Sequence, residues 1–365
     1  MINHRVIGLM SGTSLDGLDV ICVRFSYRNT WKYQIEYCTT YTYSDKWIQK
    51  LKTAPQLNEE QIKLLDLEYG ILLGEMINHF IQENNILKTE LDLISSHGHT
   101  IFHQPEKGIT IQIGDGQAIS NLTKINVINN FRALDVSLGG QGAPLVPIGD
   151  QLLFSEYTYC LNLGGIANIS VKEDDEIKAG DIAFANMVSN DLAKKKNLTY
   201  DMDGHLAESG CINTWLLNEL NELPYFHEPF PKSLASEGYV NWFKPVLEKY
   251  DLPVEDKLHT VGKHLCIQIK NVIKENQSPV LITGGGAFNS FWIKNLSNLG
   301  LNIKIPSREL VEFKEALIFA LLGVLKKENM VNVLSSVTGS SSDSSSGDVF
   351  YPNSQSYPLL KPLHK

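Results

Sequence analysis

The stretch that decides the fold is GLMSGTSLDGLD, residues 8–19. It continues a short apolar run at residues 5–10 and leads into a second run, 20–27, with several β-branched residues. Such runs predict strands, and the Asp16-Gly17 pair between them suits a hairpin turn. A glycine-rich turn can bring consecutive backbone N–H groups close to an oxyanion. Residues 8–19 therefore predict two strands joined by a loop that could bind an anion.

Two further glycine loops follow. Residues 159–163 and 169–171 read as strands around Gly164-Gly165-Ile166-Ala167-Asn168, so the strand–loop–strand pattern occurs twice. A third cluster, residues 284–289, follows a strand-like run and leads into an expected helix. Neither a Walker loop nor a dinucleotide fingerprint fits, because residues 12–17 lack a following Lys-Ser/Thr and a strand comes next. The pattern instead predicts two related halves whose hairpins clamp the phosphates of ATP, as in actin-like and hexokinase-like proteins.

Composition excludes several classes of protein. The chain has 365 residues, which at roughly 150 residues per domain predicts one large or two ordinary domains. Lys and Arg number 32 against 41 Asp and Glu, and no long basic run occurs, so no nucleic-acid partner is expected. The longest apolar run, residues 316–325, is about half the length of a membrane span and predicts a buried helix, so no membrane partner is expected. Five scattered cysteines and the lack of a signal-peptide pattern favour the reduced cytoplasm.

The remaining segments predict a mixture of helices and strands. Residues 61–84 have helical spacing of leucine and isoleucine, whereas 92–96, 110–113 and 125–129 read as short strands. The serine-rich residues 335–346 read, by composition, as a mobile loop or disordered segment. The ending, residues 359–365, reads as an irregular tail.

A series of motifs accompanies the glycine loops. In chain order they are residues 8–19, Ser96-His97-Gly98-His99-Thr100, Gln112-Ile113-Gly114-Asp115, Phe131-Arg132 with Asp135, Gly139-Gly140-Gln141-Gly142-Ala143-Pro144-Leu145-Val146-Pro147, Asn162-Leu163-Gly164-Gly165-Ile166-Ala167-Asn168, Tyr200-Asp201 with Asp203-Gly204, residues 284–289, Glu315-Ala316, and Ser336-Val337-Thr338-Gly339. With these motifs in this order, nearly the whole chain resembles the anhydro-N-acetylmuramic acid kinases. The last motif lies in the serine-rich stretch and favours an ordered loop at its start.

The resemblance implies an α/β, two-domain actin-like (ribonuclease H-like) fold with an ATP cleft between the lobes. We expect an N-terminal lobe at 1–140, completed by about 347–365, and a C-terminal lobe at 141–346. The implied cofactors are ATP and Mg²⁺, and the implied partners are a small amino-sugar substrate and a second copy of the chain in a homodimer. The family hydrolyses the anhydro bridge of 1,6-anhydro-N-acetylmuramic acid and phosphorylates the freed 6-hydroxyl in peptidoglycan recycling.

The resemblance also assigns tasks to residues. Asp181 falls at the position of the catalytic aspartate, where it would act as the general base toward the attacking water. The expected ATP-binding residues are Gly12, Thr13, Ser14, Leu15, Asp16, Gly17, Asp19, Gly164, Gly165, Asn168, Gly284, Gly285, Gly286 and Asn289. The expected substrate-binding residues are His97, Asp115, Arg132 and Glu315, with His97 as a donor to the sugar. Mg²⁺ would bind through ATP, with Asp16 or Asp19 as candidates to position it.

Several of these residues have plain structural alternatives. Arg132 could form a buried ion pair with Asp135 instead of binding a substrate carboxylate. Glu315 begins the apolar run, where an acid at a helix start is common on dipole grounds alone. Asp16 could simply make the turn. The spacing of His97, His99 and His103 superficially resembles a zinc cluster, although Gly98 breaks the strand regularity.

The chain departs from the family pattern at three places. Residues 182–186 read Ile-Ala-Phe-Ala-Asn where Thr-Gly-Pro-Gly-Asn is usual, residues 232–237 read Lys-Ser-Leu-Ala-Ser-Glu in place of Lys-Ser-Thr-Gly-Arg-Glu, and His99 replaces a glutamine. Alanine Cβ atoms and the Phe184 ring would crowd a phosphate or sugar if the lost glycines approach it. The alternative to an active kinase is therefore a catalytically weak homologue that binds nucleotide or sugar and serves as a regulatory protein.

Overall fold

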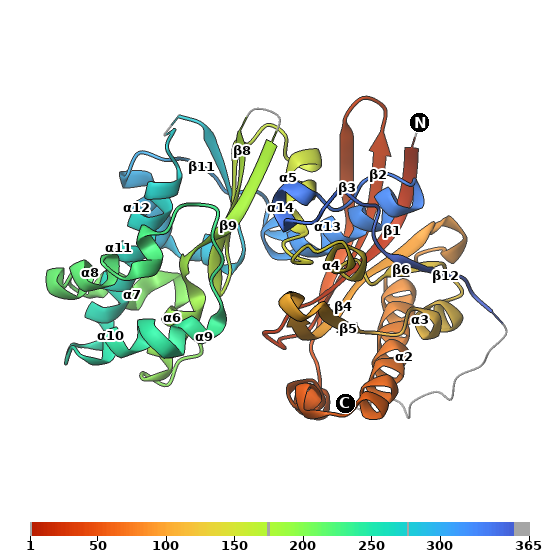
Figure 1. Ribbon diagram of the computed structural model, residues 1–365, viewed down its shortest axis with the longest axis horizontal. Helices are drawn as coiled ribbons and strands as arrows, with labels where there is room; N and C mark the ends of the chain where they lie inside the picture. The colour runs from red at the N-terminus through yellow and green to blue at the C-terminus, as the bar shows by residue number, and fades with distance from the viewer. Residues whose placement is uncertain (1, 174–175, 276, 354–365) are drawn as a thin grey trace. The chain divides into compact units, whose positions relative to one another are not determined.

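The computed structural model describes residues 2–173, 176–275 and 277–353 (Figure 1). The chain divides into two compact units, Met1–Leu153 with Glu315–Lys365, called unit 1 here, and Phe154–Lys314, called unit 2. Each unit contains its own sheet, so the two-domain α/β organisation is confirmed.

The units differ in extent from the lobes expected at 1–140 and 141–346, because residues 141–153 and 315–346 belong to unit 1. Helix α13 (Arg308–Lys327) provides the physical reason. The Ser95 hydroxyl of the unit 1 sheet donates to the Phe319 carbonyl oxygen at 2.5 Å, and the Phe319 ring packs against Phe131 with centroids 6.0 Å apart. Residues 347–353 also lie in unit 1, whereas 354–365 and the tail expected there lie outside the described residues.

Unit 1 is built on a seven-stranded sheet with the order β12-β6-β4-β1-β2-β3, and β5 pairs with β4. Strands β1, β2 and β3 form an antiparallel meander, while β1 also pairs in parallel with β4, and β4 with β6. The strands are β1 Ile2–Ser11, β2 Leu18–Tyr27, β3 Trp31–Tyr41, β4 Leu93–Gln104, β5 Ile109–Ile113, β6 Val127–Asn129 and β12 Asp348–Phe350.

The long helix α2 covers one face of this sheet, where its Leu72 and Leu73 share a core with Ile7 and Leu9 of β1. A capping box fixes the start of α2, since the side chains of Asn58 and Gln61 each accept a hydrogen bond from the other residue's backbone N–H group. The helices of unit 1 are α1 Asp45–Thr53, α2 Glu59–Glu83, α3 Gly116–Thr123, α4 Ala133–Ser137, α5 Val146–Leu153 and α14 Ser335–Thr338, with α13 from Glu315 on and the short η1 Ala54–Gln56, η2 Lys88–Glu90 and η3 Pro105–Lys107.

The apolar run at residues 316–325 lies buried inside α13, as predicted. Over the described part of the chain, no helix combines the length and the apolar character needed to cross a membrane. The serine-rich stretch starts with α14, and further on the backbone N–H of Ser346 donates to Asn332 Oδ1 at 2.7 Å. Its ordered start is therefore confirmed.

Unit 2 repeats this plan with a five-stranded sheet of order β11-β10-β7-β8-β9. Strands β7, β8 and β9 form an antiparallel meander, and β7 pairs in parallel with β10. The strands are β7 Tyr159–Leu163, β8 Ile166–Glu173, β9 Glu176–Phe184, β10 Pro279–Thr283 and β11 Asn302–Lys304. The helices are α6 Asn186–Lys194, α7 His205–Ser209, α8 Thr214–Asn221, α9 Ser236–Gly238, α10 Lys244–Glu248, α11 Val254–Val272 and α12 Ser290–Asn298, with the short η4 Met202–Gly204, η5 Pro224–His227, η6 Tyr239–Phe243 and η7 Gly285–Phe288.

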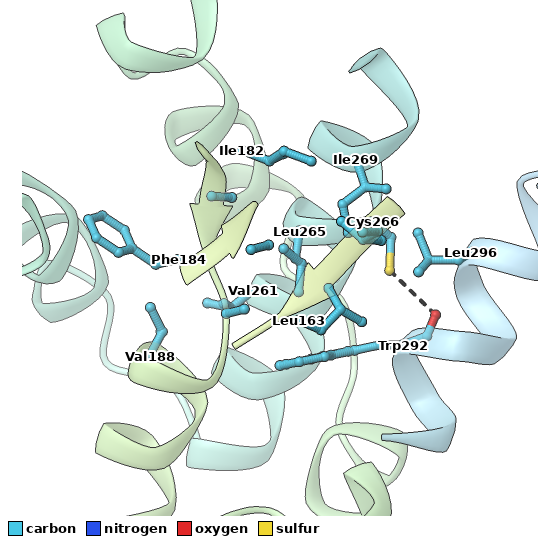
Figure 2. Close-up of a cluster of buried hydrophobic side chains, with 14 of the residues drawn as sticks. Leu163, Ile182, Phe184, Val188, Val261, Leu265, Cys266, Ile269, Trp292 and Leu296 are labelled. Atoms are coloured by element: carbon cyan, nitrogen blue, oxygen red, sulfur yellow. Dashed lines mark hydrogen bonds between the residues drawn. The ribbon is translucent and has the colours of Figure 1, made fainter. Parts of the chain in front are cut away.

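The core of unit 2 lies between one face of its sheet and the helices α6, α11 and α12 (Figure 2). Leu163 of β7, Leu265 of α11 and Trp292 of α12 meet there, and the Cys266 thiol donates to the Trp292 carbonyl oxygen at 3.7 Å. In both units an antiparallel meander thus begins with a strand that also pairs in parallel, which confirms the two related halves.

Candidate active site

The first glycine turn, residues 12–17, joins β1 to β2 after the Ser11–Leu18 pair. Thr13, Ser14 and Asp16 are exposed, and the Leu15 N–H donates to the Gly12 carbonyl oxygen at 3.3 Å. The turn therefore presents a short polar stretch of backbone at the end of a strand pair. Contact with ATP by residues 12–17 stays a prediction.

Asp16 and Asp19 place two carboxylates at this turn. Asp16 Oδ1 accepts from the Ser14 hydroxyl at 2.5 Å, and Asp19 Oδ1 accepts from the Thr40 hydroxyl at 2.6 Å. The first bond shows that Asp16 does take part in forming the turn. Carboxylate oxygens are the ligands that Mg²⁺ prefers, and the ion keeps several waters, so few protein ligands are required. The donor set fits a magnesium ion that arrives with a nucleotide.

Arg132, just before α4, carries a guanidinium that is only partly satisfied. Its Nη1 donates to the Gly142 carbonyl oxygen at 2.7 Å and its Nη2 to His97 Nε2 at 2.9 Å. Its Nε is buried and has no hydrogen-bond partner among the described residues. Burial lowers the pKa of Arg132 to about 10, against the opposing effect of the Glu315 carboxylate, so the group is still a cation at neutral pH. A buried cation with an unused donor suits an anionic ligand.

The structure excludes two of the plain structural explanations, one for Arg132 and one for Glu315. Asp135 is completely buried and accepts from the Gly142 N–H at 2.7 Å and the Thr338 hydroxyl at 2.7 Å, so it braces two loops and the alternative of an ion pair with Arg132 is wrong. Glu315 lies in the interior of α13, which begins at Arg308, so the helix-start explanation is also wrong. Its charge instead acts on Arg132.

The His97 ring is engaged at both nitrogens. Nδ1 lies 2.9 Å from the Gly98 carbonyl oxygen and must donate, which leaves Nε2 to accept from Arg132. Burial lowers the pKa of His97 well below its usual range and favours this neutral form. His97 therefore holds Arg132 in place. Its one N–H is given to Gly98 here, so the predicted donation to the sugar would require that bond to be exchanged.

The other two histidines of the motif have separate partners. His99 Nδ1 lies 3.0 Å from the Ser11 hydroxyl, and His103 Nδ1 lies 3.2 Å from the Thr110 hydroxyl. Within residues 2–173, 176–275 and 277–353, no three His, Cys, Asp or Glu side chains are grouped to hold a metal ion. The zinc alternative thus has no support from the geometry.

Asp115 serves as the N-cap of α3, because its Oδ1 accepts from the Ala118 N–H at 2.6 Å. Asp66 of α2 supports the same turn by accepting from the Gly114 N–H at 2.6 Å. Burial, with the nearby charge of Asp115, raises the pKa of Asp66 to about 6. Sequence reasoning missed Asp66, which lies in an ordinary helical pattern. A substrate contact by Asp115 stays a prediction.

The second glycine turn, Gly164-Gly165, is held by backbone groups. The Ala185 and Met187 N–H groups donate to the Gly165 carbonyl oxygen at 2.9 and 3.1 Å, and the Asn186 N–H donates to that of Gly164 at 3.1 Å. The Asn186 side-chain amide adds bonds of 2.9 Å to the carbonyl oxygens of Leu163 and Gly164. Because the carbonyl oxygens are occupied by the start of α6, the N–H side of the turn is the one left to meet a ligand.

The third glycine loop, Gly284-Gly285-Gly286, follows β10. Gly284 has φ +78°, and a Cβ there would collide with Asn162 Oδ1, so no other residue fits without a shift. Asn289 caps α12 by accepting from the Trp292 N–H at 3.0 Å. Asp203 accepts from the Ser290 hydroxyl, which ties the 200–204 motif to this loop.

Asp181 lies on β9 and is held by the segment that departs from the family pattern. Its Oδ2 accepts from the Leu234 N–H at 2.8 Å, and its own N–H donates to the Lys232 carbonyl oxygen at 2.7 Å. Burial raises the pKa of Asp181, although the bonds from Leu234 and Ser233 oppose this. A carboxylate made more basic by burial is better suited to take a proton from water.

The substitutions after Asp181 place their side chains in the core of unit 2. Phe184 is fully buried and its ring packs against Tyr239, Trp242 and Phe243, with centroids 5.7, 5.4 and 5.2 Å away. Figure 2 shows this ring in the hydrophobic core of unit 2. Ala183 and Ala185 are buried in the same core. The expected crowding is therefore wrong for Phe184.

A polar row crosses the unit 2 sheet at this point. Thr283 is opposite Asn162, Asn162 is opposite Asn168, and Asn168 is opposite Asp181. Directly paired residues place their side chains on one face, and a bulge between Ala167 and Asn168 brings this alignment about. The Thr283 hydroxyl is buried without a partner among the described residues. Because Asn162 alternates along β7 with the buried Leu161 and Leu163, the sequence could have shown on which face of the sheet its side chain lies. The sequence could not have shown which residues of the neighbouring strands lie beside it.

Two α/β units with the same meander and parallel-strand topology, each with a polar turn after its first strand, define the class of two-domain actin-like folds. Comparisons with known proteins identify the family. The family model "Anhydro-N-acetylmuramic acid kinase" matches residues 4–352. This chain belongs to the anhydro-N-acetylmuramic acid kinase family.

Individual relatives are similar over most of their length. The anhydro-N-acetylmuramic acid kinase of Clostridioides difficile is 34% identical, with 91% of this chain and 94% of the relative covered. That of Francisella tularensis subsp. novicida is 33% identical, with 92% and 96% covered. Among solved structures, component A of the (R)-2-hydroxyglutaryl-CoA dehydratase of Acidaminococcus fermentans is 12% identical with a TM-score of 0.45, covering 87% of this chain and 96% of that one.

Proposed function

We propose that this chain is an ATP-dependent kinase that opens the anhydro bridge of 1,6-anhydro-N-acetylmuramic acid with water and phosphorylates the freed 6-hydroxyl. The observation that carries the proposal is Asp181, a half-buried carboxylate with a raised pKa on the strand beside the second glycine turn. Family membership over residues 4–352 supports the same activity.

The residues divide the reaction among them. Asp181 takes a proton from water as the water oxygen bonds to the anomeric carbon. The bond from that carbon to the bridging oxygen breaks, and the freed oxygen accepts the γ-phosphoryl group of ATP, leaving ADP. Arg132, with its unpaired Nε, binds the lactyl carboxylate, and His97 keeps the guanidinium oriented.

Phosphoryl transfer requires positioning and charge stabilisation more than covalent chemistry. The N–H groups of the turns at residues 12–17, 164–165 and 284–286 are proposed to hold the phosphates. Magnesium bound through ATP would supply charge neutralisation there, with Asp16 or Asp19 as the protein residue that positions it. Asn168, opposite Asp181, and Asn289 remain proposed ATP contacts.

The decisive test measures ADP release with and without 1,6-anhydro-N-acetylmuramic acid. Sugar-dependent ADP release and formation of the 6-phosphate are expected. ATP binding without such release would reject the kinase and favour the regulatory homologue. The buried position of Phe184 removes the main structural motive for that alternative.

The proposal extends to a homodimer in the cytoplasm. Support for the compartment comes from the sequence, in which the five cysteines are scattered and form no C-x-x-C pair. Support for the homodimer comes from the family resemblance alone. Light scattering on the purified chain is expected to give twice the monomer mass, and a monomer mass would reject the dimer.

A further inference from the structure

A buried chain of polar groups lies under the first glycine turn. Ser11, Tyr43, Tyr69 and His99 are 2%, 6%, 0% and 3% exposed. The Tyr69 and Tyr43 hydroxyls are 2.6 Å apart, Tyr43 donates to the Ser11 hydroxyl at 2.8 Å, and the Ser11 hydroxyl lies 3.0 Å from His99 Nδ1. These side chains come from β1, the segment before α1, helix α2 and β4, so the chain links four separate parts of unit 1.

One direction of donation satisfies every group in this chain. Because Tyr43 donates its proton to Ser11, its oxygen accepts from Tyr69. The Ser11 oxygen accepts from Tyr43, and its own proton goes to His99 Nδ1. Burial favours a protonated Tyr43 hydroxyl and a neutral His99 ring, since it raises the pKa of Tyr43 to about 12 and lowers that of His99 to about 4. His99 is therefore the neutral hydrogen-bond acceptor at which this series of hydrogen bonds ends.

Ser11 is the residue from which the first turn departs. It pairs with Leu18 across the hairpin and with His99 across the parallel β1–β4 ladder. The β1–β4 register shifts between Leu9 and Ser11, so the ladder is interrupted just before the turn. At such an irregularity the backbone ladder alone holds the strand end less firmly, and the side-chain bonds of Ser11 replace the missing support.

We propose that this hydrogen-bond chain positions the first glycine turn for nucleotide binding, and that residue 99 must be an acceptor for it to do so. His99 is then a positioning residue. Glutamine, usual at this place in the family pattern, also offers an acceptor oxygen, whereas leucine offers none. The inference rests on the proposed function only in that the first turn binds ATP.

The test compares His99→Gln with His99→Leu by calorimetric titration of ATP in the absence of sugar. The His99→Leu variant is expected to bind ATP about tenfold more weakly, the effect of one unsatisfied buried group, and His99→Gln within about twofold of the parent chain. Equal ATP affinity in His99→Leu and His99→Gln would overturn the proposal. If the parent chain binds ATP but shows no sugar-dependent ADP release, the kinase activity fails while the role of His99 is still decided.

Amide hydrogen exchange at residues 12–17 provides a readout that needs neither ligand nor turnover. Faster exchange is expected in His99→Leu and also in Tyr43→Phe, which keeps the ring and serves if the first variant does not fold. Tyr41→Phe is the matched control, because the Tyr41 hydroxyl bonds to Glu83 at 2.8 Å, outside the chain. Unchanged exchange in Tyr43→Phe, or equal acceleration in Tyr41→Phe, would contradict the proposal.

Discussion

The two glycine turns occupy equivalent places in the two units, yet different groups hold them. The first, residues 12–17, departs from a strand end fixed by the side chains of Ser11, Tyr43 and His99. The second, Gly164-Gly165, is held mainly by backbone N–H groups from residues 185–187. We expect a turn held by backbone groups to tolerate side-chain changes nearby, such as the substitutions at residues 183–185. The first turn depends on particular side chains.

The largest expected effect is a loss of turnover, and it distinguishes the chemistry beside the second turn from that beside the first. Asp181→Asn removes the proposed base beside the second turn and is expected to lower turnover by about 10²–10⁴-fold, with ATP affinity unchanged. Steady-state rates and ATP titration measure the two quantities. Asp19→Asn, beside the first turn, should instead raise the magnesium concentration needed for activity. Retained turnover in Asp181→Asn would remove Asp181 from the base role.

Acid should destabilise both units through their buried histidines. Burial lowers the pKa of His264 in unit 2 to about 3 and that of His99 in unit 1 to about 4, from 6.5. Below pH 6.5 the unfolded chain binds protons that the folded chain does not, so the free energy of unfolding falls as pH falls. Each histidine contributes a slope of about 1.4 kcal/mol per pH unit.

His264→Gln should flatten this dependence between about pH 6 and 4, as measured by urea unfolding at several pH values. Asp66 has the opposite effect on the pH dependence of the free energy of unfolding, since its pKa is raised to about 6. Asp66 is present in both the parent chain and His264→Gln, so its contribution cancels when the two slopes are compared. An unaltered slope in His264→Gln would show that His264 is not protonated on unfolding in this range.

Added Cβ atoms should affect the stability of the two turns unequally. At Gly17 a Cβ would lie 2.7 Å from the Tyr41 carbonyl oxygen, whereas at Gly165 the nearest atom outside the adjacent residues would be Met187 Cβ at 4.0 Å. Gly17→Ala is therefore expected to destabilise the chain by about 1–3 kcal/mol, and Gly165→Ala by less than about 0.5 kcal/mol. Urea unfolding measures both, and equal losses would contradict the packing at Gly17.

The smallest expected effect concerns the Asn186 side chain, which supports the second turn. Asn186→Ala removes the two hydrogen bonds that the Asn186 side-chain amide donates, but it leaves the backbone N–H groups of residues 185–187 in place. We expect ATP affinity to change by less than about threefold, compared with about tenfold for Ser11→Ala at the first turn. ATP titration of both variants checks this order, and a larger loss in Asn186→Ala would reverse the comparison.

Most of the fold could be predicted from local patterns. The strand expected at residues 159–163 is β7, and the helix expected at 61–84 is α2, Glu59–Glu83, because apolar spacing and capping residues act within a few positions. The unit boundaries could not be predicted, since they depend on α13 packing against residues far earlier in the chain, as in the bond from Ser95 to Phe319.

The amino-acid sequence by itself determined the α/β class, the repeated hairpin and the family, because these depend on residue type and on order along the chain. Only the tertiary structure decided that Phe184 lies in the core, that Asp135 braces loops instead of pairing with Arg132, and that the His99 ring lies within hydrogen-bond distance of the Ser11 hydroxyl. Each of these depends on strand register and on contacts between residues distant in sequence. No local pattern encodes such a contact, since it exists only once the sheet and helices have packed.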